Sequence, residues 1–213
     1  MIKFKANELA CLRGQNLIFT NLAFEMNTGA ALVLAGPNGS GKSSLIRLLA
    51  GLIRPFAGQL SWADEDVFDD VQDHFDRLLY VGHENAIKAP LTVRENLSFW
   101  ADLYEAPEKV DEALGAFDLL PIADNPGRIL SSGQRRRLNL ARLLLSDRPL
   151  WILDEPTVGL DVNSCKDLEN LIATHRASGG MVILSTHVGI DVADHQILDV
   201  GIYSEIISNR KAG

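Results

Sequence analysis

The stretch AALVLAGPNGSGKSSLIRLLAGL, residues 30–52, decides the fold of this chain. It opens with a continuous apolar run that ends in Gly36, a pattern typical of a strand buried on both faces of a parallel sheet. A glycine-rich loop follows, and a helix with apolar periodicity begins at about Ser43. The loop matches G-x-x-x-x-G-K-[ST] and stands between a strand and a helix, as that pattern requires. The stretch therefore predicts a strand–loop–helix unit that binds phosphate.

This loop predicts a site for a nucleoside triphosphate. Its glycines let backbone N–H groups turn inward around phosphate oxygens, and the helix N-terminus adds a favourable dipole. We expect Lys42 to reach the β and γ phosphates and the Ser43 hydroxyl to hold Mg²⁺. A Gly-rich turn that matches by chance is the alternative, and the flanking strand and helix argue against it. The phosphate cradle comprises Gly36, Pro37, Asn38, Gly39, Ser40, Gly41, Lys42, Ser43 and Ser44. It does not reveal the task, because kinases, GTPases and motors share it.

Composition limits the remaining possibilities. The 213 residues are 46% hydrophobic and 7% aromatic, which suits one globular domain or a domain with an inserted subdomain. A net charge of −8 argues against a nucleic-acid groove as the main surface. Cys11 and Cys165 are far apart and share no motif, so we expect reduced thiols. No apolar run reaches the roughly 18 residues of a spanning helix, and the start lacks a signal-peptide core. We expect a soluble chain that meets any membrane through a partner.

Alternating and continuous apolar runs predict the other strands. Two alternating runs, joined by a turn at residues 13–16, favour an antiparallel hairpin. Three continuous runs separated by helical stretches favour buried parallel strands. The hairpin strands are expected at residues 3–12 and 17–26, and the buried strands at 78–82, 150–154 and 181–186.

Residues 91–147 differ from the rest of the chain. Thr92 and Glu95 form a capping-box pattern, and Val93, Leu97, Trp100, Leu103 and Tyr104 then recur at helical spacing. We therefore expect a helical subdomain here, inserted into a nucleotide-binding core made of residues 1–90 and 148–213. The predicted fold class is α/β: a P-loop NTPase core of RecA type with a mainly parallel sheet, an N-terminal antiparallel β subdomain and an inserted α-helical subdomain.

A second group of candidate residues follows two of the buried strands. In LWILDEP, Asp154 closes a strand where it can hold Mg²⁺, and Glu155 follows where it can act as general base on an attacking water. A strand that simply reaches the surface is the alternative. His187 ends the strand VILSTH at the same sheet edge, so we expect it to contact the γ-phosphate or the water. The histidines without such a placement, His74, His83, His175 and His195, are expected at the surface.

Two charged stretches have competing interpretations. The acidic residues 63–76 suggest either a divalent-ion or partner site, or a solvated loop or outer helix face with Phe68, Val71 and Phe75 at helical spacing beneath; we favour the latter. The arginines at 135–137 suggest a phosphate patch or, in our preferred interpretation, a solvated helix face.

Taken together, the cradle, LSSGQ (130–134), WILDEP (151–156), VGLD (158–161) and His187 resemble the ATP-binding cassette of ABC transporters, over essentially the whole chain. The resemblance implies that two copies pair head to tail. The bend of one copy then closes over ATP held in the cradle of the other, with the Ser131 hydroxyl and the Gly133 N–H donating to the γ-phosphate. The resemblance adds five residues to the nucleotide site: Ser131, Ser132, Gly133, Gln134 and Asp161.

Three positions depart from the family pattern. Most cassettes stack an aromatic residue on adenine where this chain has Arg13, whose guanidinium plane can also stack on a base. Glu84 stands where the family has a glutamine that touches Mg²⁺, and glutamate can still ligate the ion. Ser132 replaces the first glycine of the signature. These departures bear on nucleotide affinity and turnover rather than on the fold.

Within the family, the chain is most similar to the ATP-binding subunits of the haem exporter of cytochrome c maturation, through ELACLRGQNLIF (8–19), YVGHENAIK (80–88) and the residues around LSSGQ. That resemblance implies ATP, Mg²⁺ and a homodimer on integral membrane subunits at the cytoplasmic face of the inner membrane, with haem-handling proteins as indirect partners and no nucleic acid. A short helix of the membrane partner would enter a groove near Glu84, lined by hydrophobic residues within 86–100, unless those residues only pack internally. Two rivals remain open: a soluble assembly ATPase of the iron–sulfur scaffold type, and a nucleotide-sensing structural subunit with little hydrolysis.

Overall fold

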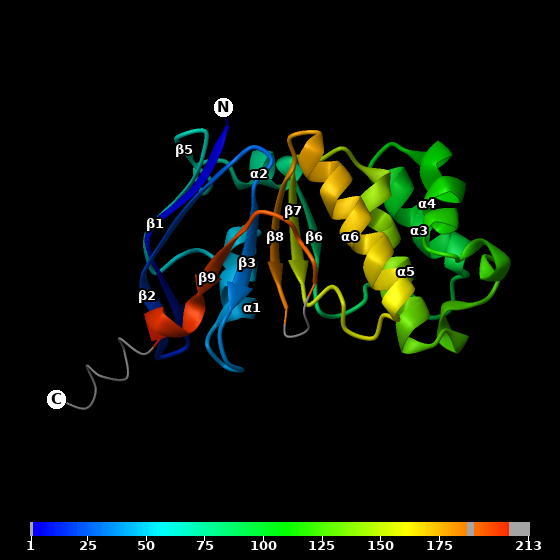
Figure 1. The fold of residues 1–213 in the computed structure, drawn as a ribbon, viewed down its shortest axis with the longest axis horizontal. Helices are drawn as coiled ribbons and strands as arrows, with labels where there is room; N and C mark the ends of the chain where they lie inside the picture. Colours follow the sequence, from blue (N-terminus) through cyan, green and yellow to red (C-terminus); the bar gives the residue numbers. More distant parts are fainter. Residues whose placement is uncertain (1, 187–189, 205–213) are drawn as a thin grey trace.

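The computed structural model describes residues 2–186 and 190–204, which form two β-sheets with helices packed between and beside them (Figure 1). The described strands of one sheet run in the order β2-β1-β4-β5, and those of the other in the order β6-β7-β8-β3-β9. The antiparallel sheet lies at one end of the molecule, and the helices of the 93–145 segment lie at the other.

The antiparallel sheet contains the predicted hairpin. Arg13 stands opposite Asn16 in the register, so the chain turns where the sequence predicts. Two further strands were not predicted: one pairs with β1, and a two-residue strand follows it. The four are β1 (Lys3–Arg13), β2 (Asn16–Asn27), β4 (Ala57–Trp62) and β5 (Glu65–Asp66).

In the second sheet every strand pairs with its neighbours in parallel, which confirms the predicted α/β core. The central strands β7 and β8 are buried at every residue, as expected for a sheet covered on both faces. The edge strand β9 was not predicted, because Leu198 is its one buried residue. The strands are β6 (Leu78–Val81), β7 (Leu150–Asp154), β8 (Met181–Ser185), β3 (Ala31–Ala35) and β9 (His195–Asp199).

The alternation of side chains along these strands divides the core in two. Ile152 and Ile183 face α1 (Lys42–Leu49) and the antiparallel sheet. Trp151 and Leu153 face α6 (Val162–Ala177) and the helices of the 93–145 segment. The parallel sheet is therefore covered by α1 on one face and by α6 on the other (Figure 1), and both faces are apolar.

All described elements between Val93 and Leu145 are helical. The Thr92–Glu95 capping box is confirmed: the Glu95 N–H donates to Thr92 Oγ1 at 3.1 Å, and the Thr92 N–H donates to Glu95 Oε2 at 2.8 Å. Leu103, in contrast, is 61% exposed, so it does not extend the buried stripe. The elements are α3 (Val93–Leu103), η1 (Pro107–Lys109), α4 (Val110–Ala116), η2 (Leu120–Ile122), η3 (Gly127–Ile129), α5 (Ser132–Ala141) and η4 (Arg142–Leu145).

The acidic stretch at 63–76 is only partly helical. It holds β5 and, after an N-cap at Asp70, helix α2 (Val71–Arg77), so Phe68 precedes the helix and the predicted spacing is wrong there. Within the described residues no three acidic, histidine or cysteine side chains gather to hold a metal ion, so an ion site in this stretch has no support.

The prediction that His74 and His175 lie at the surface is wrong for His74, and His175 is half-buried. His74 is fully buried; its Nε2 lies 2.9 Å from the Leu49 carbonyl oxygen, and its ring stacks on Phe4. The His175 ring stacks on Trp151 at 3.8 Å. Burial lowers the pKa of both rings. At His74 a flat imidazole fills a core position as an aromatic ring does, and spacing does not reveal this.

Both cysteines are free, as expected. Among the helices in the described ranges, none combines the length and the apolar character needed to cross a membrane.

Candidate nucleotide-binding site

The phosphate cradle joins the end of β3 to the start of α1. Gly36, Gly39 and Gly41 have φ angles of 130°, 82° and 102°, in the region that favours glycine. At two of them space is also short: a Cβ on Gly41 would lie 2.6 Å from Ile18 Cγ2, and one on Gly36 would lie 2.8 Å from Ser40 Oγ. The backbone therefore bends as a phosphate-binding loop must, with no side chain in its way.

Lys42 lies across the inside of this loop. It is 6% exposed, and its Nζ donates to the carbonyl oxygens of Gly36 at 2.7 Å and of Pro37 at 3.0 Å. No side chain of the described residues caps α1, so the amides of its first turn are open to an anion. A cavity of about 240 Å³ is lined by Ile18, Asn38, Gly39, Gly41, Lys42, Ser43, Ser44 and Glu155.

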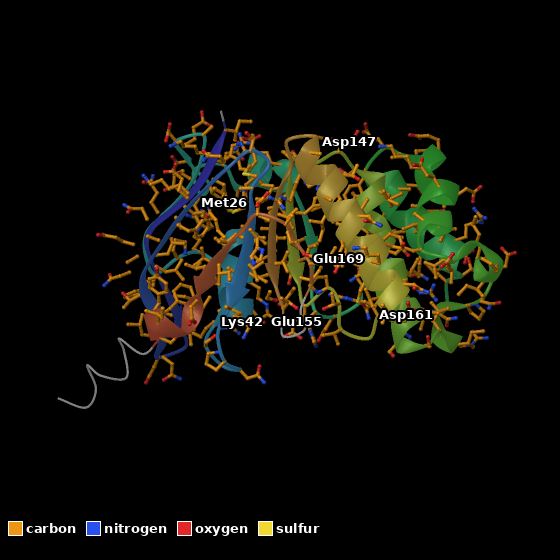
Figure 2. All side chains as sticks on the ribbon, in the orientation of Figure 1. Met26, Lys42, Asp147, Glu155, Asp161 and Glu169 are labelled. Carbon is orange, nitrogen blue, oxygen red and sulfur yellow. The ribbon has the colours of Figure 1, made fainter. Side chains whose placement is uncertain are left out.

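Ser185 of β8 holds the two acids at the end of β7, where Asp154 is the last residue of the strand and Glu155 follows it. Its hydroxyl donates to Asp154 Oδ1 at 2.7 Å and accepts the Glu155 N–H at 3.0 Å. Glu155 has a φ of 50°, an unusual backbone conformation for a residue with a side chain. That backbone conformation goes with a side chain on the wall of the cradle cavity, and Figure 2 shows Lys42 and Glu155 near the same edge of the molecule. The pattern VILSTH places a serine at the end of β8, and its hydroxyl could have indicated a hydrogen-bond partner for the acids at the end of β7.

The oxygen donors suit Mg²⁺ if phosphate completes the coordination. Asp154 ends β7 and is 3% exposed, and Ser43 lines the cradle cavity. Glu84 is exposed and lines a second cavity, of about 380 Å³, together with Asp154. The described residues contain no three-ligand cluster, and Mg²⁺ characteristically takes one or two carboxylates together with water and substrate phosphates. The Ser43 hydroxyl and the buried Asp154 carboxylate fit this coordination preference of Mg²⁺.

The signature corner, residues 131–134, lies at the start of α5. The helix begins at Ser132, and Ser131 is its N-cap in a capping box with Gln134. The Gln134 N–H donates to Ser131 Oγ at 3.2 Å, and the Ser131 N–H donates to Gln134 Oε1 at 2.9 Å. A Cβ on Gly133 would lie 2.8 Å from the Gly159 carbonyl oxygen, so this glycine permits a close backbone contact. A cavity of about 490 Å³ is lined by Ser131, Ser132, Gly133, Gln134, Arg137, Gly159, Leu160 and Asp161.

Asp161 has a local structural role in addition to its place in that cavity. It is the N-cap of α6; it accepts the Ser164 N–H at 2.9 Å and the Ser164 hydroxyl at 3.2 Å. The backbone hydrogen bond from Ser164 lowers the pKa of this carboxyl. The charge therefore sits at the positive end of α6, where it is stabilised.

The predicted roles of two residues, Arg13 and His187, have no support from the described structure. Arg13 ends β1 on the surface, and it is not among the described residues that line the cradle cavity, where β2 contributes Ile18 instead. His187 lies outside the described residues. The roles of both stay predictions.

His83 lies beside the candidate site, although the sequence did not single it out. Its ring is on the surface, as expected, yet its Nδ1 lies 3.6 Å from Glu155 Oε2. The signal was available: His83 follows β6, whose carboxyl end lies at the same sheet edge as that of β7. His83 therefore neighbours the residue expected to act as general base.

The arginines at 135–137 form neither a solvated face nor a single phosphate patch. Arg136 is 3% exposed and donates to four backbone carbonyls. Arg135 donates to the carbonyls of Leu130 and Arg128, while Arg137 donates to that of Phe117 and also lines the corner cavity. Backbone carbonyls of neighbouring segments accept hydrogen bonds from these guanidinium groups, which composition alone does not reveal.

A larger cavity, of about 540 Å³, lies away from this chemistry. It is lined by Trp151 and His175 near the amino end of β7, and by Asp147, which Figure 2 shows at the edge opposite Lys42. Volume is therefore a poor guide here, and the cradle cavity holds the donors for a triphosphate.

Comparisons with known proteins agree with this geometry. The family model described as ABC transporter matches residues 19–158. A curated cytochrome c biogenesis ATP-binding export protein, CcmA, of Paramagnetospirillum magneticum is 52% identical over 200 residues, which covers 92% of each chain. Its counterpart in Rhodospirillum rubrum is 54% identical over 196 residues, covering 92% of this chain and 84% of that one.

Solved structures support the fold. An ATP-binding subunit of an ABC transporter superimposes with a TM-score of 0.80 at 24% identity, covering 93% of this chain and 86% of the other. A putative ABC transporter ATP-binding protein from Pyrococcus furiosus gives 0.81 at 21% identity, covering 95% and 99%. The chain is thus an ATPase that belongs to the ABC transporter family and, within it, to the cytochrome c biogenesis ATP-binding export proteins.

Proposed function

We propose that two copies of this chain close on ATP and, by hydrolysing it, drive integral membrane subunits in haem export or delivery for cytochrome c maturation. One observation carries the proposal: the residues of the cradle and those of the signature corner line two separate cavities. Figure 2 shows Lys42, Glu155 and Asp161 near one edge of the molecule, so a second copy facing that edge could reach all of them.

Exposed apolar side chains around the signature corner support a partner there. Ile129, Val158 and Val162 are 60%, 46% and 86% exposed. Ile129 precedes the corner in the chain, and Val158 and Val162 flank residues 159–161, which line the corner cavity. Burial of these side chains would favour association. In a head-to-tail pair, the Ser131 hydroxyl, the Gly133 N–H and the positive end of α5 would meet the γ-phosphate held in the partner's cradle.

Each residue of the proposed reaction has one task. Lys42 binds the β and γ phosphates, and the first-turn amides of α1 hold their oxygens. Ser43, Asp154 and Glu84 would hold Mg²⁺, which supplies neutralisation of phosphate charge when bound. Glu155 accepts the proton of the attacking water. His187 would contact the γ-phosphate, and Arg13 would stack on the base.

The cargo and the location follow the curated relatives, whose printed name is cytochrome c biogenesis ATP-binding export protein. We place this chain peripherally on the cytoplasmic face of the inner membrane, where it would meet haem-handling proteins indirectly. In this proposal residues 91–147 form the helical subdomain that contacts the membrane partner, and residues 1–90 and 148–213 form the core.

A groove on the helical subdomain suits that contact. A cavity of about 310 Å³ is lined by Asn85, Ala86, Ile87, Lys88, Asn96, Phe99 and Trp100. Phe99 is 44% exposed, with Lys88 Nζ at 4.0 Å from its ring centre, whereas Val93 and Leu97 are buried within the subdomain. The exposed part of the predicted 86–100 stretch is therefore the part available to a short helix of the partner.

The test is ATP-dependent pairing of a hydrolysis-deficient variant. Glu155→Gln removes the general base while keeping size and shape, so the ATP-bound pair should persist. Light scattering after size exclusion should give a dimer with ATP and Mg²⁺, and a monomer with ADP. The double variant Glu155→Gln with Lys42→Ala, which cannot hold the triphosphate, should stay monomeric. Wild-type protein that hydrolyses ATP at full rate as a strict monomer would contradict the proposal.

A second measurement separates the rivals. Expressed with its natural membrane neighbours, the chain should co-sediment with membranes and lose that association in Phe99→Glu. A soluble assembly ATPase would remain in the supernatant with or without the substitution. A nucleotide-sensing structural subunit would bind ATP in both cases but show no turnover that depends on Glu155.

A further inference from the structure

Arg136 is a buried cation of α5. Its side chain reaches the carboxyl end of β7, where the proposed base lies. Arg136 lies in the middle of α5, and the residue is 3% exposed. A guanidinium so deeply buried is costly unless its donors are used. The contacts of this one therefore indicate what it is for.

Most of its donors reach the segment that carries the proposed base. Nη2 donates to the carbonyl oxygens of Asp154 and Glu155, both at 2.8 Å. Nε donates to that of Pro156 at 3.0 Å. Three consecutive carbonyls are thus held by one rigid, planar group, a geometry that lysine cannot reproduce.

The remaining donor reaches the β6–α3 connection. Nη1 donates to the Gly82 carbonyl at 2.9 Å and lies 3.5 Å from Asn85 Oδ1. Asn139, on the same helix, also approaches Asn85 Oδ1, at 3.4 Å. Asn85 lines the groove proposed for the membrane partner. Arg136 therefore joins α5, the end of β7 and that groove.

The backbone at Glu155 needs such support. Its φ of 50° is sparsely populated by residues with a side chain and persists only where neighbours hold it. Ser185 holds its N–H from one side, and Arg136 holds its carbonyl from the other. The direction of the carboxylate toward the cradle cavity depends on that backbone.

We propose that Arg136 is a positioning residue that ties the carboxylate of Glu155 to the signature helix, so that displacement of α5 moves the base. The inference rests on the proposed role of Glu155. Through Arg136, a movement of the helical subdomain would shift the carboxylate of Glu155. Either the second copy or a membrane partner could cause that movement.

Arg136→Gln tests the link, with Arg136→Lys as the conservative variant and Arg135→Gln as matched control. Arg135 lies on the same helix and also donates to two carbonyls, but both belong to the 93–145 segment. Misplacement of a catalytic group by about 1 Å can cost roughly 10²-fold. We therefore expect kcat of Arg136→Gln to fall between about 10- and 100-fold, with KM and ATP affinity close to wild type. Arg136→Lys should recover part of the loss.

Readouts other than turnover distinguish positioning from simple packing. Rates are normalised to ATP-binding sites, so loss of folded protein does not count. Hydrogen exchange in the peptide that contains Glu155 should quicken in Arg136→Lys and not in Arg135→Gln. Should Arg136→Gln not fold, Arg136→Lys alone carries the test through its kcat and its exchange rate. The proposal would be overturned if Arg136→Lys kept the wild-type kcat and the wild-type exchange rate while Arg136→Gln was either unfolded or fully active.

A double variant separates failure of this inference from failure of the proposed function. If Arg136 acts through Glu155, Arg136→Gln should add little to the loss already caused by Glu155→Gln, because both act on one group. Fully multiplied losses would place Arg136 elsewhere and refute the link. Full activity of Glu155→Gln by itself would instead refute the proposed base, whatever Arg136 does.

Discussion

The phosphate cradle and the signature corner are both serine–glycine turns at the start of a helix. They differ in whether a side chain accepts hydrogen bonds from the first backbone amides of that helix. The cradle contains three glycines with positive φ, and no described side chain caps its helix. The corner is closed by a capping box between Ser131 and Gln134. One helix start thus keeps its donors for a ligand, and the other has already used part of them.

Charge separates the two regions further. The cradle holds the buried ammonium of Lys42 between its own carbonyls, whereas the corner cavity has Arg137 at its wall. A loop with open amides and an enclosed cation can bind a triphosphate by itself. A capped corner can add only a few donors to a phosphate that is presented to it. Serine–glycine turns of similar composition thus leave the first amides of α1 open and use part of those of α5 in a capping box.

The largest effect is expected from Glu155→Gln, which should leave both regions intact. Loss of the general base should lower hydrolysis by roughly 10²–10⁴-fold, while ATP affinity stays near wild type. Steady-state phosphate release and equilibrium binding of a fluorescent ATP analogue measure the two quantities. Unchanged turnover would remove Glu155 from the reaction.

Lys42→Ala should break the cradle alone. Charge-assisted hydrogen bonds contribute roughly 1.5–3 kcal/mol each, so ATP affinity of the isolated chain should fall by about 10- to 100-fold. Calorimetric titration of the monomer checks this. Arg135→Gln removes a positive charge outside both sites and serves as control. Equal loss in the two variants would mean that net charge, rather than the cradle, sets affinity.

Gly133→Ala should damage the corner and spare the cradle. The new Cβ would meet the Gly159 carbonyl oxygen at 2.8 Å, and the two backbone segments would have to separate. Overpacking of this kind typically costs about 1–3 kcal/mol, so we expect roughly a tenfold loss of ATP-dependent dimerisation in the Glu155→Gln background. ATP affinity of the monomer should not change; if it falls with the dimerisation, the two regions are not separable.

Ser131→Ala should give the smallest effect and resolves the two uses of that hydroxyl. Loss of an N-cap costs about 1 kcal/mol of stability, measurable by urea unfolding. Thr92→Ala removes the equivalent cap from α3 and should cost a similar amount. Only Ser131→Ala should also weaken ATP-dependent pairing. Identical behaviour of the two variants would reduce Ser131 to a helix cap.

Much of the fold was predictable because its signals are local. Continuous apolar runs identified β3, β6, β7 and β8, and the capping box at Thr92 identified the start of α3. The strand β9 was missed because it lies at the edge of the sheet, where Ile197 is 66% exposed and neither alternation nor a buried run marks it. Strand β4 likewise begins with exposed residues.

The position of the candidate site residues in the fold was predictable where these residues are contiguous in the chain. Asp154 and Glu155 could be placed because a fully buried strand must end beside them. The partners that hold them could not: Ser185 and Arg136 are distant in the chain, and arginine in a helix usually signals a solvated face. His83 was missed for the same reason, since its approach to Glu155 depends on how two strands lie side by side.

The amino-acid sequence alone determined the cradle, because glycines at fixed offsets set the backbone of a single loop and the adjoining strand and helix orient it. Only the tertiary structure decided that Arg136 is buried, that Gly133 touches the backbone at Gly159, and that His83 neighbours Glu155. The physical reason is that a turn is governed by the torsions of its own residues, whereas those contacts join segments whose separation in the chain says nothing about their distance in space.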